Sequence, residues 1–293
     1  MPIDHFSGES VLSKMPEVLE WLTSFGFKAL STRYSRYIKY IDAFFESENP
    51  DSEAGRAKFD ALTKSYKECV EILIIKTVFC DEKSEKFKSK LKEVIKGKDH
   101  LDSSSACGAR DYLYELIVAA KFSKAGYSID WEGLTDVVAS KSGVKVFIEC
   151  KRITSEKRFE ENFNKAGKQL KREMAKEKGT KSGLVFIDVS NCIVKAVPNH
   201  EVSDPVIAKL IIDNAVNGFV KRNSYHIESL NQKYSRYSLG VCLTGQASIW
   251  TEDLTHYLVS KTDVRAYSKQ SDIKFQKLNS ILNGIENSFI GLL

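Results

Sequence analysis

The chain has 293 residues, of which 42% are hydrophobic and 28% are charged, and its formal net charge is +5. This composition is ordinary for a globular protein of one large or two smaller domains, and the mild basic excess permits nucleic-acid binding without requiring it. No apolar run approaches the roughly 20 residues of a membrane-spanning helix, so we expect no membrane partner. No secretory signal is evident, and the six cysteines and five histidines lack CxxC, HxxxH or HExxH spacing. We therefore expect a cytoplasmic protein with reduced thiols and no zinc site.

Helical patterns fill the first hundred residues. Pro16 suits the first turn of a helix over residues 16–27, and longer helices are predicted over residues 31–48, 53–82 and 83–99. The helix over 31–48 places aromatic side chains on one stripe and basic side chains on another. We interpret these stripes as a core face and a solvated face, although interleaved aromatic and basic residues could also contact nucleic acid.

A serine-rich segment at residues 102–105 is the clearest loop, and we place a domain boundary there. We therefore predict an all-helical N-terminal domain over residues 1–103 and a second domain over residues 104–293. The N-terminal domain shows no chemical motif. We expect it to hold a substrate for the second domain, to bind a partner protein or to form a homodimer.

The next helix, predicted over residues 108–125, is apolar on nearly all sides except at Glu115. If it is buried, such a carboxylate must be paired, protonated or bound to a metal. Glu115 is therefore a site residue, a surface residue, or the partner of Arg110 or Lys151 in an ion pair. A strand is predicted directly afterwards, over residues 127–131.

Residues 134–153 predict a β-hairpin. Two runs rich in β-branched residues flank Ser142-Gly143, and a small polar residue followed by glycine is a turn signal. With the turn at these residues, Lys141 pairs with Val144 and the strands continue outward in register. One face of the hairpin is then apolar, which predicts a core face. It holds Val137, Ala139, Val144, Val146, Ile148 and Cys150.

The same register places Asp136 opposite Glu149 on the other face, with Lys151 two positions along. Carboxylates whose Cβ atoms are about 5 Å apart repel each other unless a cation lies between them. Mg²⁺ or Mn²⁺ suits such oxygen ligands, and the lysine could orient water or neutralise an oxyanion. The alternative is an exposed hairpin end at which Glu149 and Lys151 form an ion pair. Asp130 and Glu132 are rival acids that lack this register.

Asp136, followed after the hairpin by Glu149-Cys150-Lys151, resembles the signature of the PD-(D/E)XK nuclease superfamily, with a threonine in place of the usual preceding proline. The resemblance implies a restriction-endonuclease-like α/β fold, in which a mixed sheet is flanked by helices. It implies that Asp136, Glu149 and the main-chain carbonyl of Cys150 hold Mg²⁺ or Mn²⁺. Lys151 would then position or activate the attacking water.

This resemblance covers about residues 108–190 and extends to the helices on either side of the hairpin. It implies that Glu115 completes the acidic cluster or binds a second metal ion. It also implies that Gln169, on the helix after the hairpin, orients the substrate or Lys151.

That helix is predicted over residues 156–178 and is rich in charge. Lys165, Lys168 and Arg172 recur at helical spacing and are candidates for binding a phosphate backbone. Glutamates are interspersed among them, so the alternative is a solvated face with ion pairs along the helix. By the family pattern, Lys168 and Gln169 lie nearest to the site.

The remainder of the chain completes an alternation of strands and helices. Strands are predicted over residues 184–190, 192–197, 238–244, 247–251 and 257–260, with a turn at Gly245-Gln246, and helices are predicted over residues 204–220 and 269–289.

We therefore expect a Mg²⁺-dependent nuclease that hydrolyses phosphodiester bonds of nucleic acid, with DNA as the expected substrate. A restriction- or phage-defence-type role is implied by the resemblance alone. Two other classes stay open. One is a catalytically silent nuclease fold that binds nucleic acid or a partner protein, and the other is a structural or adaptor subunit.

Overall fold

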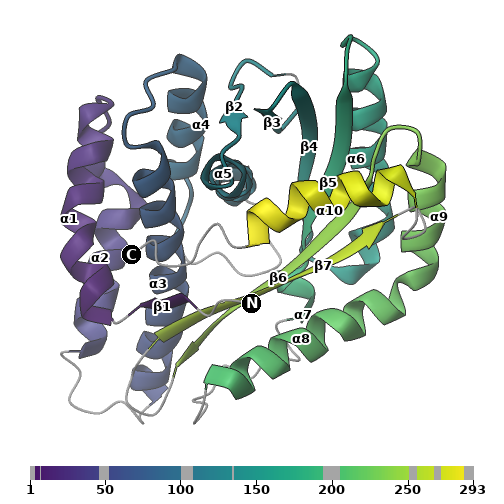
Figure 1. Cartoon of the computed structure of the whole chain (residues 1–293). Helices are drawn as coiled ribbons and strands as arrows, with labels where there is room; N and C mark the ends of the chain where they lie inside the picture. The colour runs from purple at the N-terminus through teal and green to yellow at the C-terminus, as the bar shows by residue number, and fades with distance from the viewer. Residues whose placement is uncertain are drawn as a thin grey trace.

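The computed structural model describes residues 4–6, 8–45, 53–99, 108–133, 135–193, 205–250, 256–266 and 272–286. These residues form a seven-stranded sheet with helices on both faces (Figure 1). The strands are β1 (Asp4–Phe6), β2 (Ser128–Ile129), β3 (Val137–Lys141), β4 (Val144–Arg152), β5 (Lys181–Asp188), β6 (Gly240–Trp250) and β7 (His256–Ala266). The helices are α1 (Gly8–Ser24), α2 (Arg33–Phe45), α3 (Glu53–Phe79), α4 (Glu85–Ile95), α5 (Gly108–Lys124), α6 (Phe159–Met174), α7 (Ser190–Ile193), α8 (Pro205–Arg222), α9 (Ser224–Tyr234) and α10 (Ile273–Glu286).

The sheet is mixed. Its strand order is β1-β7-β6-β5-β4-β3-β2; β4, β5 and β6 are parallel neighbours, and every other neighbouring pair is antiparallel. The expected α/β class, with a mixed sheet flanked by helices, is therefore confirmed. Within the described ranges, no helix combines the length and the apolar character that crossing a bilayer requires.

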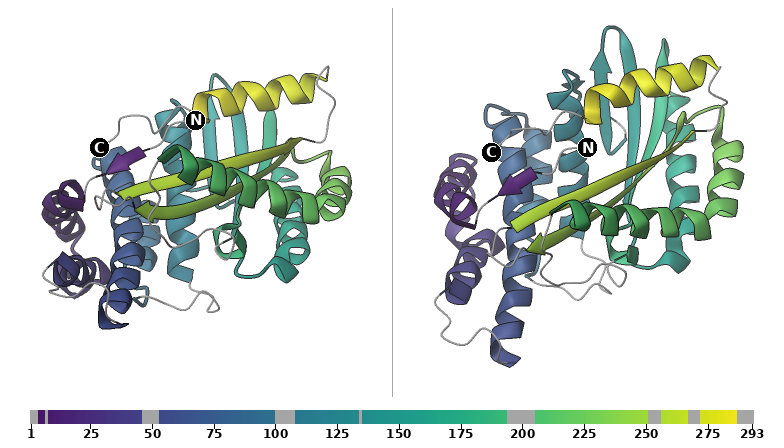
Figure 2. Two further views of the ribbon diagram at one scale, coloured as in Figure 1. Left: turned by 90° about the horizontal axis from the view of Figure 1, so that it is seen from below. Right: turned by 60° about the horizontal axis from the view of Figure 1, so that its bottom comes forward.

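Two hydrophobic clusters cover the two faces of the sheet, and the hairpin β3–β4 contributes to both. Val137 and Ile148 pack in one cluster with side chains of α1 to α5 and α10, whereas Val138 and Phe147 pack in the other with α6, α8 and α9. Neighbouring residues of a strand point to opposite faces, so this division follows the alternation of the sequence. Figure 2 shows α8 and α9 well apart from α1 and α2 in both of its views.

The N-terminal helices belong to the same core as the sheet. Buried side chains of α1 to α4 lie in one cluster with those of α5, β3 and β4. The prediction that residues 1–103 are all-helical is wrong, because strand β1 pairs antiparallel with β7 at the edge of the sheet. The expected domain boundary at residue 103 falls within residues 100–107, outside the described residues, and the chain on its two sides shares this core.

The predicted start of the first helix at Pro16 is wrong. Helix α1 begins at Gly8, and Pro16 lies inside it. Val11, Met15, Val18 and Leu22 are all buried and recur at helical spacing across it. Burial of this continuous stripe therefore outweighs the main-chain hydrogen bond that the proline removes.

Two predictions in the second half of the chain are wrong. Residues 192–193 belong to helix α7 and not to a strand, because the Asp188 carboxylate accepts the main-chain N–H of Ser190 (2.9 Å) and turns the chain there; residues 194–197 lie outside the described residues. Gly245 does not form a turn, since β6 runs straight through it and pairs with β7. A Cβ atom on Gly245 would lie 2.4 Å from Val216 and 2.6 Å from Ile193, so this glycine serves close packing against α7 and α8.

Candidate active site

The hairpin has the predicted register. Lys141 pairs with Val144 and Val137 pairs with Ile148. Ser142 and Gly143 both have positive φ, at 50° and 76°, as a two-residue turn of type I′ requires. Because the pleat fixes which side chains share a face, this turn also decides which residues reach the site.

Asp136 and Glu149 come together at the open end of this hairpin. Asp136 directly precedes β3, and the next pair outward from Val137 and Ile148 is Asp136 and Glu149. The Asp136 Oδ2 atom accepts the main-chain N–H of Cys150 at 2.8 Å, which fixes the aspartate against β4. The predicted neighbourhood of the two acids is therefore present.

Lys151 lies between the two acids. Its Nζ atom is 3.1 Å from Oε2 of Glu149 and 3.3 Å from Oδ2 of Asp136. The side chain of Glu149 is only 1% exposed, whereas those of Asp136 and Lys151 are 22% and 18% exposed. The ion pair of Glu149 with Lys151 that the alternative interpretation expected is present, but the exposed hairpin end is not, since Glu149 is buried.

Burial and neighbouring charges shift the pKa values of Glu149 and Lys151. The pKa of Glu149 is raised to about 8, first by burial and then by the charge of Asp136, against the opposing effect of Lys151. Burial lowers the pKa of Lys151, but the charges of Asp136 and Glu149 outweigh it and raise the pKa overall. Glu149 therefore keeps its proton at neutral pH in the metal-free protein, where Lys151 lies against both acids.

Glu115 joins the cluster from α5, and its partner is Lys90 of α4. The Lys90 Nζ atom lies 2.5 Å from Oε2 of Glu115 and 2.7 Å from the main-chain carbonyl oxygen of Asp136. Burial raises the pKa of Glu115 to about 7, although Lys90 lowers it. Arg110, considered above as a partner of Glu115, binds Glu68 instead at 2.7 Å. Lys90 was missed because no pattern distinguishes it among the lysines of its helix.

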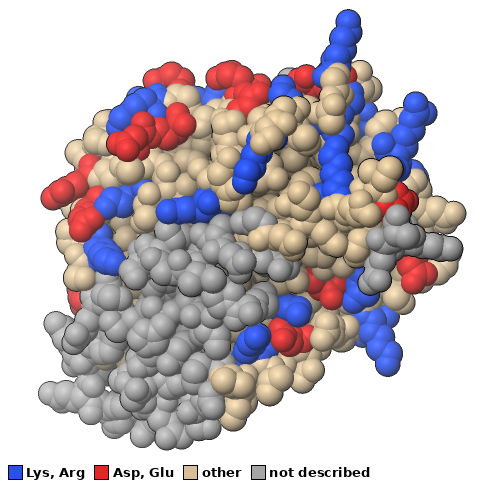
Figure 3. Space-filling view, viewed as in Figure 1, with Lys and Arg blue, Asp and Glu red and all other residues tan. Residues whose placement is uncertain are grey.

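The basic candidates on α6 face solvent. Lys165 is paired with Glu161 at 2.6 Å, Arg172 is 65% exposed and paired with its neighbour Glu173 at 2.5 Å, and Lys168 is exposed. These ion pairs fit the alternative of a solvated helix face. On the face seen in Figure 3, the described Lys and Arg side chains are likewise mixed with Asp and Glu.

Gln169 is half-buried on the same helix. The helix covers the sheet face to which Phe147 and, by alternation, Glu149 belong. Among the described residues, however, Gln169 has no hydrogen-bond partner, and its role in orienting Lys151 stays a prediction.

A second charged cluster, not predicted, adjoins the acids on the other face of β4. The Nε atom of Arg152 lies 3.1 Å from Asp188 of β5, and its Nη1 atom lies 3.7 Å from Asp111 of α5. Asp188 follows an unbroken apolar run and lies at the carboxyl end of a parallel strand. Functional sites commonly form at such strand ends, so the sequence position of Asp188 could have identified it as a candidate site residue.

Asp136 and Glu149 could provide two carboxylate ligands for a divalent cation. Among the described residues, no three His, Cys, Asp or Glu side chains form a group that could hold a metal ion. Mg²⁺ often takes only one or two carboxylates and completes its shell with water and substrate oxygens, so Asp136, Glu149 and the carbonyl of Cys150 are a sufficient set. The rival acid Asp130 pairs with Lys145 (3.9 Å), at the opposite end of β4.

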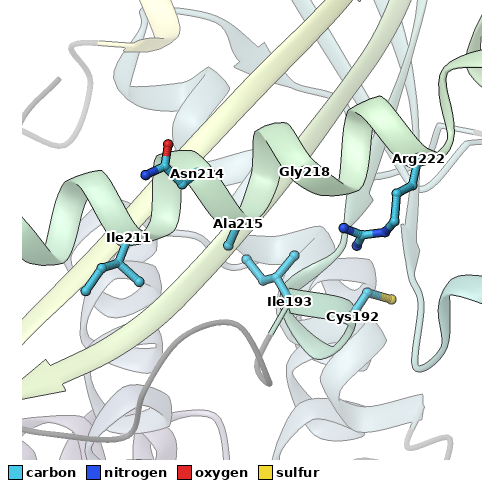
Figure 4. A pocket seen from close by; sticks show the side chains of 7 residues that line it. All are labelled: Cys192, Ile193, Ile211, Asn214, Ala215, Gly218 and Arg222. Carbon is cyan, nitrogen blue, oxygen red and sulfur yellow. The ribbon is translucent and has the colours of Figure 1, made fainter.

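A cavity of about 350 Å³ opens between α7 and α8. Figure 4 shows Arg222 and Cys192 near one end of this cavity and Ile211 at the other. It shares no residue with the acidic cluster, and Arg222 is already bound to Glu156 at 3.0 Å. The cavity is therefore separate from the candidate active site.

Comparisons of the chain with protein-family models, with curated proteins and with solved structures gave no match. The geometry of the acidic cluster is therefore the basis on which a function can be assigned.

Proposed function

We propose that this protein is a metal-dependent nuclease of the PD-(D/E)XK type that hydrolyses phosphodiester bonds of nucleic acid, with DNA as the expected substrate. The supporting observation is the cross-strand meeting of Asp136 and Glu149 with Lys151 bound to both. When both acids are ionised, the two carboxylates and the Lys151 ammonium sum to a net charge of −1, which a divalent cation would offset.

The sheet arrangement supports the finer fold proposal. Helix α5, strand β2, the antiparallel hairpin β3–β4, helix α6 and the parallel strand β5 follow one another, and this order supports the restriction-endonuclease-like fold that the resemblance implies. The restriction- or defence-type role is part of the proposal and is supported only by the sequence resemblance.

Each residue of the site has a defined task under this proposal. Asp136, Glu149 and the main-chain carbonyl of Cys150 would hold Mg²⁺ or Mn²⁺, which when bound neutralises phosphate charge and lowers the pKa of its water. Lys151 reaches both acids, and its ammonium would orient the attacking water and stabilise negative charge on the phosphate. Gln169 would orient the substrate or Lys151 from α6.

The test is a cleavage assay with Mg²⁺ or Mn²⁺ on double-stranded DNA, single-stranded DNA and RNA. We expect Asp136→Ala and Lys151→Met to lower the cleavage rate by about 100-fold or more, since each removes a group that acts on the transition state. Asp130→Asn is the control, because it removes an acid that pairs with Lys145 at the opposite end of β4, outside the cluster, and it should cleave normally.

Two results would redirect the proposal. If nucleic acid binds but no substrate is cleaved with any metal, the protein is a silent binding module of this fold. If neither binding nor cleavage occurs, an adaptor role becomes the better assignment.

A further inference from the structure

Lys90 connects the N-terminal helices to the candidate active site. It extends from α4 and contacts two groups at once, the Glu115 carboxylate at 2.5 Å and the main-chain carbonyl of Asp136 at 2.7 Å. Its side chain is 21% exposed and that of Glu115 is 13% exposed. The contact is therefore largely shielded from solvent, where an ion pair is stronger than on the surface.

The position of Lys90 is fixed by the packing of its helix. Phe87 and Leu91, which flank it on α4, are both fully buried. Trp131, just before the hairpin, packs against Phe87 with ring centroids 5.0 Å apart, and its indole N–H donates to Glu82 at 2.7 Å. Helix α4 and the segment that leads to Asp136 are thus held together, so the lysine is held near the acids.

The charges in direct contact favour a single divalent ion. Glu115, Asp136 and Glu149 contribute −3 when ionised, and Lys90 and Lys151 contribute +2, which sums to −1. One divalent ion changes this sum to +1, which a phosphodiester of charge −1 neutralises. A second divalent ion would bring the sum to +3 and would have to displace Lys90 from the Glu115 carboxylate.

We infer that Lys90 supplies, from within the chain, the positive charge that a second metal ion would otherwise bring to Glu115, so that the site takes one divalent ion at Asp136 and Glu149. This inference rests on the proposed function, because it assumes that the acid pair binds a metal. Lys90 is a positioning residue under this inference, since it acts through Glu115 and Asp136.

The test is the number of Mn²⁺ ions bound per chain, measured by isothermal titration calorimetry without substrate. We expect one ion for the parent protein and two for Lys90→Met, in which Glu115 is released as a ligand. Lys90→Arg and the control Lys86→Met, an exposed lysine one turn earlier on α4, should each bind one.

Glu115→Gln provides a second arm that does not depend on the folding of Lys90→Met. It should still bind one ion, because Glu115 is not a ligand while Lys90 is present. Two ions in the parent, or loss of the ion in Glu115→Gln, would overturn the inference and leave the proposed function in place. No Mn²⁺ binding by the parent protein would instead overturn the proposed function, and the inference with it.

Discussion

Replacing Glu149 by glutamine should stabilise the metal-free protein at alkaline pH. Glu149 is 1% exposed, and its pKa is raised from 4.5 to about 8 by burial and then by the neighbouring charge of Asp136. Glutamine has nearly the same shape as the protonated acid and never ionises. The substitution therefore removes the cost of a buried charge without opening a cavity.

The sign and the size follow from linkage between protonation and folding. Between pH 4.5 and 8 the folded protein keeps the Glu149 proton while the unfolded chain has lost it, so the free energy of unfolding falls as pH rises. Each pKa unit is worth about 1.4 kcal/mol, and the whole window is therefore worth about 5 kcal/mol. Below pH 4.5 both states are protonated and the effect vanishes.

The assay is denaturant unfolding in the presence of a chelator at pH 5 and pH 8. Relative to the parent, Glu149→Gln should change little at pH 5 and should gain several kcal/mol at pH 8. Glu173→Gln is the control, because hydrogen bonds from Lys176 and Arg172 lower the pKa of Glu173. That variant should lose stability by a similar amount at both pH values, since Glu173 is ionised in both states throughout this range.

The reasoning is refuted if Glu149→Gln is less stable than the parent at pH 8, or if its advantage is the same at both pH values. Either result would mean that Glu149 is ionised in the metal-free fold, with Lys151 compensating its charge.

Three further outcomes are expected. Mg²⁺ should raise the melting temperature more at pH 8 than at pH 5, because Glu149 must lose its proton to bind it, and an equal rise at both pH values would contradict the assignment. Ser142→Asn should add about 0.5 kcal/mol to the free energy of unfolding, since asparagine tolerates the positive φ beside Gly143 better than serine does; a loss of stability would argue against the turn. Gly167→Ala should cost about 1–3 kcal/mol, because its Cβ atom would lie 2.3 Å from the Tyr234 ring. The control Gly108→Ala, whose Cβ meets nothing within 4 Å, should change stability by less than about 0.5 kcal/mol.

Local rules were sufficient for the hairpin. Its two strands are joined by a two-residue turn, and the side-chain period of a strand is two, so the turn position alone decides that Asp136 faces Glu149 and that Lys151 shares their side. The same rule separated Val137 from Val138 into the two core layers. These features depend on residues close together in the chain, and the sequence determined them.

Packing between distant segments decided the rest. Lys90 is 46 positions from Asp136 and 25 from Glu115, and only the docking of α4 against α5 brings them together. Glycine is typical of turns, so Gly245 predicted one. In the fold, however, the missing side chain of Gly245 lets α7 and α8 approach β6. Local pattern cannot reveal such contacts, because they depend on which faces of separate elements meet. The sequence by itself therefore fixed the pair of acids and their lysine, and the tertiary structure determined which further charges surround them.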